Sequence, residues 1–209
     1  MENLDSTALA ALRAELARTF SDVTLFGRRV LRRSLRRYQV GPAQAIVDAV
    51  LQRRGLTFAV MMPRQAGKNE TSAHVEALLL NLCRGRGGFI VKASPTFRPQ
   101  ALNSMMRLQA LFSDSRLPPL EREGAHMLRV GLARAAFLSA APGANVVGAT
   151  ANILLEADEA QDVDETKWNK DFRPMAASAN TTTVLWGTAW TSQTMLARTI
   201  RALRWAEGR

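Results

Sequence analysis

The segment that most constrains the fold covers residues 61–70, with the sequence Met-Met-Pro-Arg-Gln-Ala-Gly-Lys-Asn-Glu. The apolar run at 56–62 is typical of a buried strand, and the apolar spacing over 70–83 is typical of a helix. A strand, a Gly-Lys turn and a helix form the context in which a chain binds phosphate. We expect Gly67 to let the backbone approach the ligand, while Lys68 and the free N–H groups of the helix N-terminus attract its charge.

This segment departs from the strict phosphate-loop pattern at two positions. Met62 stands where the pattern has its first glycine, and Asn69 stands where it has Ser or Thr. The alternative interpretation is an ordinary strand-to-helix turn with an exposed lysine. A second motif elsewhere in the chain is needed to choose between the two.

That second motif lies about ninety residues downstream, where the apolar run at 153–155 ends in acidic residues. Burying adjacent carboxylates costs free energy unless they serve a purpose. We expect Asp158 to hold Mg²⁺ through water and Glu159 to polarise the water that attacks the γ-phosphate. Glu156 is irregular, since the strand before such a pair is usually apolar throughout. The alternative is a strand that runs into an acidic loop, but the Gly-Lys loop upstream favours a nucleotide site.

The charge of the chain predicts a polyanionic partner. The net charge is +10, and 24 of the 28 basic residues are arginine, whose planar guanidinium group suits phosphate and carboxylate. Six of them recur at a spacing that predicts shared faces of one helix: Arg28, Arg29, Arg32, Arg33, Arg36 and Arg37. This stripe is interpreted either as a contact with DNA phosphates or an acidic neighbour, or as a solvated helix face.

Cysteine content and hydropathy exclude several classes of protein. Cys83 is the only cysteine, so an internal disulfide is impossible and a cysteine-based metal site is not expected. The N-terminus has no basic leader segment, and no apolar run approaches membrane-spanning length. We therefore expect a soluble intracellular protein with no membrane partner.

Taken together, the segments resemble the ATPase domain of the large terminase subunit, the motor that packages DNA into tailed-phage procapsids. The resemblance spans roughly residues 38–190. Four pieces carry it: Tyr38-Gln39 is similar to the family's adenine-reading motif, 63–70 to its divergent phosphate loop, Asp158-Glu159-Ala160-Gln161 to its Walker B motif with catalytic glutamate, and Gly187-Thr188 to the position of its coupling motif.

The resemblance implies the fold and the domain organisation. We expect an α/β P-loop NTPase of the ASCE type, with a mostly parallel central sheet flanked by helices. An Arg-rich helical arm over residues 1–37 is expected to precede an ATPase domain over 38–209. Family members also carry a nuclease domain, which we expect to be absent from this chain.

The resemblance also implies the site residues for Mg²⁺-dependent ATP hydrolysis. The catalytic residues are Glu159, Lys68 and Arg64, and the Mg²⁺ ligands are Asp158 and Asn69. ATP contacts come from Gln39, Gln65, Ala66, Gly67, Lys68, Asn69, Glu70 and Thr188.

An arginine finger between subunits is a further feature of the family. Family members often have an Arg-Gly pair shortly before the Walker B strand, and Val147-Gly148 stands near that place. Arg64 in cis and Arg134 in trans are the remaining candidates.

The partners implied are double-stranded DNA, further copies of the chain in a ring on the portal, the portal protein and the small terminase subunit. The implied location is the cytoplasm of the infected bacterial host, not the mature virion. One alternative is the first motor domain of a superfamily-2 helicase, which has similar motifs but normally needs a second motor domain. The other is a non-catalytic basic nucleic-acid-binding or assembly module with a decayed phosphate loop, an idea that Met62, Asn69 and Glu156 favour.

Overall fold

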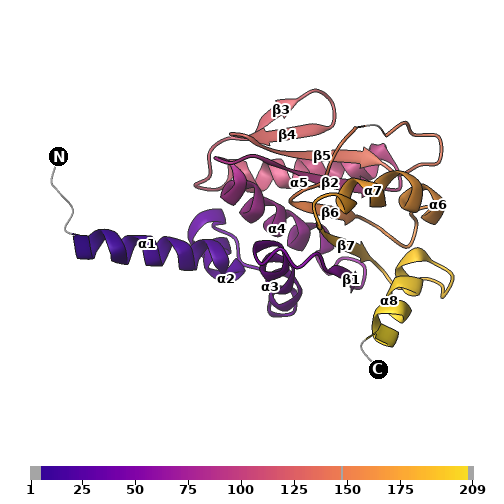
Figure 1. The fold of residues 1–209 in the computed structure, drawn as a ribbon, viewed down its shortest axis with the longest axis horizontal. Helices are drawn as coiled ribbons and strands as arrows, with labels where there is room; N and C mark the ends of the chain where they lie inside the picture. The colour runs from indigo at the N-terminus through magenta and orange to yellow at the C-terminus, as the bar shows by residue number, and fades with distance from the viewer. Residues whose placement is uncertain (1–5, 147, 207–209) are drawn as a thin grey trace.

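The structure is a computed structural model and describes residues 6–146 and 148–206. Within these residues a seven-stranded sheet runs in the order β1-β7-β6-β2-β5-β4-β3. The strands are β1 (Thr57–Met61), β2 (Gly88–Ser94), β3 (Glu121–Glu123), β4 (Met127–Val130), β5 (Ala133–Ser139), β6 (Leu154–Ala157) and β7 (Thr182–Gly187). From β1 to β5 each neighbouring pair is parallel, and β4 and β3 extend the sheet as an antiparallel hairpin. The mostly parallel sheet and its flanking helices confirm the predicted fold class (Figure 1).

Helices cover both faces of this sheet because its central strands are apolar on both faces. They are α1 (Ser6–Ser21), α2 (Val23–Phe26), α3 (Arg37–Leu51), α4 (Lys68–Cys83), α5 (Leu102–Ser113), α6 (Glu165–Lys167), α7 (Arg173–Ala177) and α8 (Met195–Ala206), with π-helical segments η1 (Gly27–Leu31), η2 (Phe97–Ala101) and η3 (Trp168–Phe172). Successive residues of a strand point to opposite faces. Leu154 of β6 accordingly packs in the cluster formed with α3, α4 and α5, whereas Leu155 packs in the cluster formed with η3, α7 and α8.

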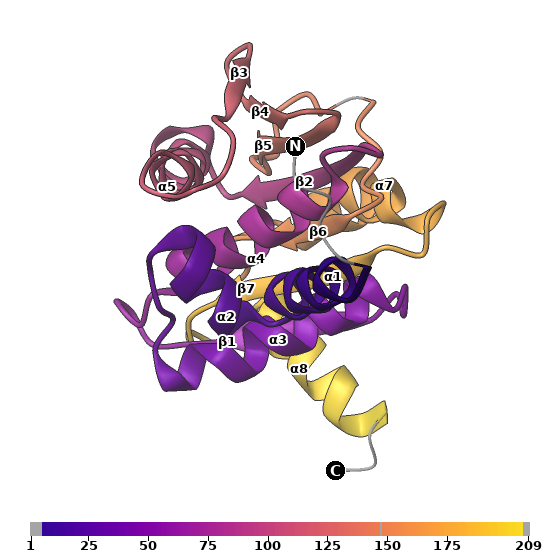
Figure 2. The ribbon, with the colours of Figure 1, turned by 90° about the vertical axis from the view of Figure 1, so that its left-hand side faces the viewer.

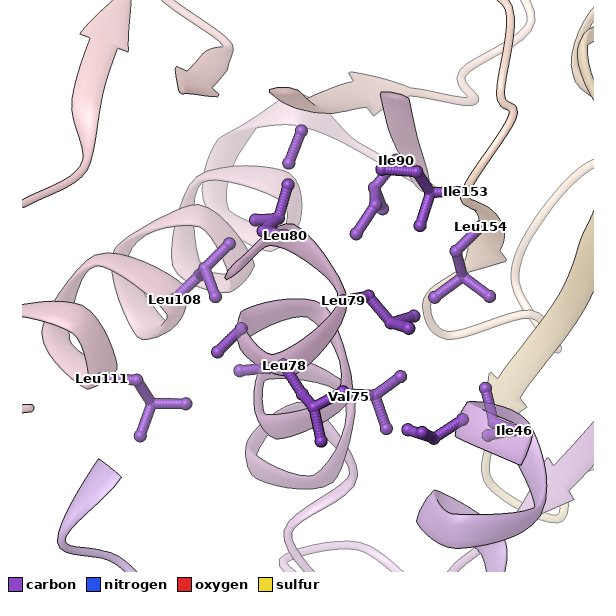
Figure 3. Packing of buried hydrophobic residues seen from close by; sticks show 14 of the residues in the cluster. Ile46, Val75, Leu78, Leu79, Leu80, Ile90, Leu108, Leu111, Ile153 and Leu154 are labelled. Carbon is purple, nitrogen blue, oxygen red and sulfur yellow. The ribbon is translucent and has the colours of Figure 1, made fainter. Parts of the chain in front are cut away.

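Helix α4 lies at the centre of the first of these clusters. Figure 3 shows Leu79 of α4 lying toward Leu154 of the sheet, while Leu78 lies on the side of α5 and its residue Leu111. The helix is buried along nearly its whole length, so it has no polar face of the kind seen on surface helices. Close packing on all sides holds its N-terminus, and therefore Lys68, in place against the sheet.

The arginine-rich segment is not the continuous helix that its spacing predicted. Segment η1 ends at Leu31, Arg32 is left-handed with φ 56°, residues 33–36 have no helical structure, and α3 begins at Arg37. Phe26 and Leu31 are fully buried in the core cluster that includes α4. Burial of these apolar anchors overrides the local helical preference, so the six arginines do not share one helix.

Helix α1 projects away from the body of the domain (Figures 1 and 2). Leu9, Leu12 and Leu16 are exposed there. Val23 of the next helix is already buried in the core, and the predicted division between an arm and an ATPase domain stays a prediction. In the part of the chain that the structure describes, no helix combines the length and the apolar character needed to cross a membrane.

Candidate functional site

The predicted motifs meet at one edge of the sheet. Strands β1, β6 and β7 are parallel neighbours, so their carboxyl ends share an edge. Strand β1 leads into the phosphate loop, β6 into the acidic pair, and β7 into Thr188. A cavity of about 430 Å³ at this edge is lined by seven of the predicted site residues, namely Arg64, Gln65, Lys68, Asn69, Asp158, Glu159 and Thr188.

A larger cavity of about 1060 Å³ lies elsewhere, between β5 and the loop that precedes β6. Its lining is mainly apolar, and Arg134 is the charged residue that it contains alongside His126. Size alone would favour this cavity, but catalysis of phosphoryl transfer requires converging charged and polar groups. The smaller, polar cavity is therefore the candidate site.

The phosphate loop turns through two left-handed residues, Gln65 with φ 60° and Gly67 with φ 78°. Gly67 is the N-cap of α4. The positive φ favours glycine here, and a Cβ atom added to Gly67 would lie 2.5 Å from Nε2 of Gln39, so the end of that side chain would have to move. The turn places the unpaired N–H groups of the first turn of α4 next to the cavity, where they can bind an anion.

Lys68 brings the motifs together. Its side chain is only 7% exposed, and its Nζ donates a hydrogen bond of 2.7 Å to Oγ1 of Thr188. The same Nζ lies 3.6 Å from Oε1 of Glu159. A positive charge, a hydroxyl from the coupling motif and a carboxylate thus converge within one site.

The two carboxylates of the predicted Walker B segment differ in their surroundings. Asp158 is buried, and its Oδ2 accepts a hydrogen bond of 2.8 Å from Oγ of Ser104 while its Oδ1 accepts one of 3.0 Å from the backbone N–H of Glu159. Glu159 is half-buried and left-handed, with φ 47°, a conformation that is strained for a residue with a side chain. The structure therefore holds Asp158 rigidly and turns Glu159 out of the strand into the cavity.

Three residues of the site had no role assigned from the sequence. Gln161 donates to Oε2 of Glu159 at 2.8 Å and accepts from the backbone N–H of Thr188 at 3.0 Å, so it ties the Walker B segment to the coupling motif. Its place in the Asp-Glu-Ala-Gln motif was the available signal. Ser104 lies on α5, far away in the sequence, and Trp190, 71% exposed, is recognisable as a cavity residue only in the folded chain.

Gln39 is placed against the phosphate loop. Its Nε2 donates to the carbonyl oxygens of Ala66 and Gly67 at 3.0 and 3.1 Å, and its Oε1 accepts from the backbone N–H of Arg36 at 2.8 Å. The amide expected to read adenine thus braces the turn that carries Lys68. Recognition of adenine by Gln39 stays a prediction that requires these bonds to be exchanged.

Two other predicted residues have different surroundings. Glu70 does not line the cavity, and its carboxylate pairs with Arg107 at 3.2 Å and Arg33 at 3.6 Å. Arg64 is exposed, lines the cavity and has no acidic partner among the described residues. It is free to contact a ligand, whereas a nucleotide contact by Glu70 stays a prediction.

Arg134, the candidate for a finger in trans, lies away from this cavity. Arg134 is the second residue of β5, at the strand end opposite the candidate site, and its Nε pairs with Glu123 at 2.8 Å. This contact raises the pKa of Arg134 and lowers the pKa of Glu123. Val147 lies outside the described residues. A role for Arg134 in a neighbouring subunit stays a prediction.

Five buried polar residues lie one layer further from the cavity, and we call them the buried network: Ser72 and Glu76 of α4, Lys92 of β2, Glu156 of β6 and Trp186 of β7. Lys92 donates to Oε1 of Glu76 at 2.9 Å and to Oγ of Ser72 at 2.7 Å. Oε1 of Glu156 accepts from Oγ of Ser72 at 2.8 Å and from Nε1 of Trp186 at 2.6 Å.

The charged groups in the buried network shift one another's pKa values. Burial disfavours the charged form of Lys92, but the carboxylates of Glu76, Glu156 and Asp158 outweigh it and raise the pKa of Lys92 above its usual value. Burial also raises the pKa of Glu156 well above its usual range; Lys92 opposes this rise and Glu76 adds to it. The network therefore keeps a protonated lysine inside the protein.

The donor set at the cavity fits Mg²⁺. Asp158 supplies one carboxylate and Asn69 supplies an amide oxygen, and both line the cavity. Mg²⁺ is usually bound by one or two carboxylates together with water and substrate phosphates. Among the described residues there is no cluster of three or more His, Cys, Asp and Glu that could hold a metal by itself.

Solved structures of phage large terminases share this fold. The HK97 bacteriophage large terminase aligns with a TM-score of 0.69 and 15% identity over 90% of this chain and 42% of its own. The Thermus phage P74-26 large terminase ATPase domain aligns with a TM-score of 0.51 and 19% identity over 64% of this chain and 59% of its own. A large terminase from another thermophilic bacteriophage aligns with a TM-score of 0.53 and 13% identity over 75% of this chain and 39% of its own.

The alignments cover less than two thirds of each of these solved chains. The sequence matches no protein-family model and no curated protein sequence. At such low identity the likeness establishes the fold, and it agrees with the terminase resemblance of the motifs. The chain has the fold of the phage large terminase ATPase domain.

Proposed function

We propose that this chain is an ATPase that powers the translocation of double-stranded DNA into a viral procapsid. The observation that supports it most directly is the convergence of Lys68, Glu159 and Thr188 in one cavity, with Lys68 Nζ 2.7 Å from Thr188 Oγ1 and 3.6 Å from Glu159 Oε1. A catalytic carboxylate beside the phosphate-binding lysine is the arrangement that ATP hydrolysis needs.

Each residue of the cavity has a distinct task in this proposal. The N–H groups at the start of α4 and the ammonium group of Lys68 bind the β- and γ-phosphates. Glu159 orients the attacking water and accepts its proton. Asp158, with Asn69, holds Mg²⁺, which neutralises charge on the phosphate oxygens when it is bound with ATP. Arg64 stabilises charge that develops on the transferred phosphoryl group.

The proposed partners follow from charge and from the terminase resemblance. The net charge of +10 suits a polyanion such as DNA, and Arg28, Arg32 and Arg37 are exposed without acidic partners among the described residues. A ring of identical copies on the portal, contacts with the portal protein and the small terminase subunit, and action in the cytoplasm of the infected host complete the proposal.

Phosphate release from ATP in the presence of Mg²⁺, measured over a range of protein concentrations, tests this function. We expect turnover, and we expect specific activity to rise with protein concentration because a neighbour's arginine completes the site. Lys68→Ala should abolish both ATP binding and hydrolysis. Lys170→Ala is the matched control, since Lys170 is exposed and outside the cavity, and it should behave like the wild type.

Each alternative has its own signature in the same experiments. If the wild type binds no ATP, the basic nucleic-acid-binding module with a decayed phosphate loop replaces the motor. ATP-driven separation of DNA strands, in place of movement along intact duplex, would instead indicate the helicase. Flat specific activity over the whole concentration range would mean that one chain contains the complete site, with Arg64 acting in cis.

A further inference from the structure

Glu156 lies where the three motif-bearing elements meet. Helix α4 begins at Lys68, strand β6 runs into Asp158, and strand β7 runs into Thr188. Oε1 of Glu156 accepts hydrogen bonds from α4, through Ser72 at 2.8 Å, and from β7, through Trp186 at 2.6 Å. One carboxylate oxygen thus joins all three elements.

Three residues of the buried network lie at sequence offsets that place them on the same face of their helix or strand as a site residue. Ser72 follows Lys68 by one helical turn, so both lie on the same face of α4. Glu156 and Trp186 each lie two residues before a site residue, a spacing that keeps them on the same face of their strands as Asp158 and Thr188. The buried network therefore forms a second layer of side chains beneath the candidate catalytic groups.

Lys92 completes this layer from the neighbouring strand. The register pairs Lys92 of β2 directly with Glu156 of β6, and Lys92 donates to Ser72 at 2.7 Å and to Glu76 at 2.9 Å. The exposed fractions of these side chains are 2% or less. No water competes for these bonds, so each bond holds its two elements at a defined separation.

Glu156 helps to keep the buried Lys92 protonated, but a buried ion pair is weak evidence of a gain in stability. A buried ionisable group costs free energy, and an apolar side chain of similar volume is often neutral or stabilising in its place. No donor group of another residue reaches the buried second oxygens of Glu76 and Glu156, and a side-chain contact between the two residues helps to raise the pKa of Glu156; both add to the cost. The benefit of Glu156 must therefore lie in what its first oxygen holds together.

We propose that Glu156 is a positioning residue for the ATPase reaction: by binding Ser72 and Trp186 it fixes α4 and β7 against β6. It thereby sets the separations between Lys68, Glu159 and Thr188. The inference rests on the proposed function, because the quantity that it controls is the geometry for phosphoryl transfer. Small errors in such geometry lower the rate of the chemical step more than they weaken ground-state binding.

The test removes the two bonds to Glu156 one at a time. Ser72→Ala deletes the hydroxyl from α4, and Trp186→Phe deletes the indole N–H from β7 while keeping an aromatic ring. We expect each change to lower kcat about tenfold while the KM for ATP stays within about twofold, since positioning affects the transition state selectively.

Two matched controls separate positioning from loss of packing. Ser94→Ala removes a buried hydroxyl that has no hydrogen-bond partner, and Trp168→Phe changes a buried tryptophan in the cluster on the other face of the sheet. Trp168→Phe should lower the melting temperature about as much as Trp186→Phe, and Ser94→Ala should leave it near the wild-type value. Both controls should leave kcat within about twofold of wild type.

Variants of Glu156 itself test whether the effects pass through this residue. Glu156→Gln keeps an oxygen acceptor and should retain at least about half of wild-type kcat. In a Glu156→Leu background the acceptor is gone, so adding Trp186→Phe, whose indole N–H bonds Glu156 alone, should cause little further loss of kcat, as a mutant cycle would show. Ser72→Ala should keep part of its effect there, because Ser72 also contacts Lys92 and Glu76. If the losses add in full in that background, Glu156 does not mediate them.

The outcomes distinguish this inference from the function on which it rests. A wild-type protein that does not hydrolyse ATP overturns the proposed function. An active wild type whose Ser72→Ala and Trp186→Phe variants match their controls overturns the positioning role alone. If Glu156→Leu does not fold, the comparison of the two single variants with their controls still tests the positioning role.

Discussion

The candidate cavity and the buried network use the same residue types in opposite ways. In the cavity Lys68 and Glu159 are 3.6 Å apart, and Arg64 has no acidic partner among the described residues. In the network the contacts of Lys92 and Glu156 measure 2.6 to 2.9 Å. The cavity leaves polar groups open to a ligand. In the network the protein itself supplies partners for Nζ of Lys92 and for one oxygen each of Glu76 and Glu156, and leaves their second oxygens without a donor.

Burial explains why loss of a charged partner should cost less stability in the cavity than in the network. A charge that faces the cavity is hydrated when its partner is removed, so losing a partner there costs little stability. A charge inside the network is shielded from water and cannot be hydrated when its partner is removed. Leaving such a charge unpaired typically costs several kcal/mol of stability. Changes in the cavity should therefore affect activity, and changes in the network should affect stability as well.

The largest effect is expected from Glu159→Gln, which removes the base from the cavity. We expect kcat to fall about 10³-fold, within the range for loss of a general base, while ATP binding and the free energy of unfolding stay near their wild-type values. Single-turnover hydrolysis and urea unfolding measure the two quantities. Glu165→Gln, a change in the same acidic segment but outside the cavity, should retain full activity. A Glu159→Gln variant that hydrolyses ATP normally would remove the catalytic assignment.

Lys92→Met tests the other side of the comparison. It leaves the carboxylate of Glu76 buried without its cation, and we expect a loss of about 3–5 kcal/mol in the free energy of unfolding. Urea unfolding measures this loss. Arg198→Met breaks the exposed pair with Glu165 and should cost less than about 1 kcal/mol. Equal losses in the two variants would show that burial does not distinguish the network from the surface.

Gly67→Ala acts on the cavity through the backbone. The new Cβ meets Nε2 of Gln39 at 2.5 Å, and φ is +78°, so we expect the turn to shift, ATP to bind about tenfold more weakly, and stability to fall by about 1–2 kcal/mol. Equilibrium titration with ATP measures the affinity. Gly143→Ala meets nothing within 4 Å and should leave affinity unchanged. Unaltered affinity in Gly67→Ala would argue against close approach of phosphate to this turn.

The smallest effect is expected from Ser104→Ala, which removes one hydrogen bond from Asp158. Losing one bond of about 1 kcal/mol should raise the Mg²⁺ concentration for half-maximal activity about fivefold. A Mg²⁺ titration of ATP hydrolysis measures this, with Ser113→Ala on the same helix as the control. A changed kcat with an unchanged Mg²⁺ requirement would show that Ser104 does not act through the metal ligand.

Local patterns in the chain, together with the family resemblance that they carry, predicted the fold class and the sheet edge at which the candidate site residues meet. The apolar runs, the Gly67-Lys68 turn and the acidic pair at 158–159 are such patterns, and in parallel strands they imply a shared sheet edge. Helix α4 and strands β1 and β6 appear where those patterns predicted them.

Only the tertiary structure shows which polar groups are hydrogen-bond partners. The bracing of the phosphate loop by Gln39, the contact of Ser104 with Asp158 and the pairing of Lys92 with Glu156 join segments far apart in the chain. The irregular Glu156 was visible in the sequence as an exception, but its purpose was not. Such contacts depend on strand register and on the packing of α4, and local sequence patterns do not contain either quantity.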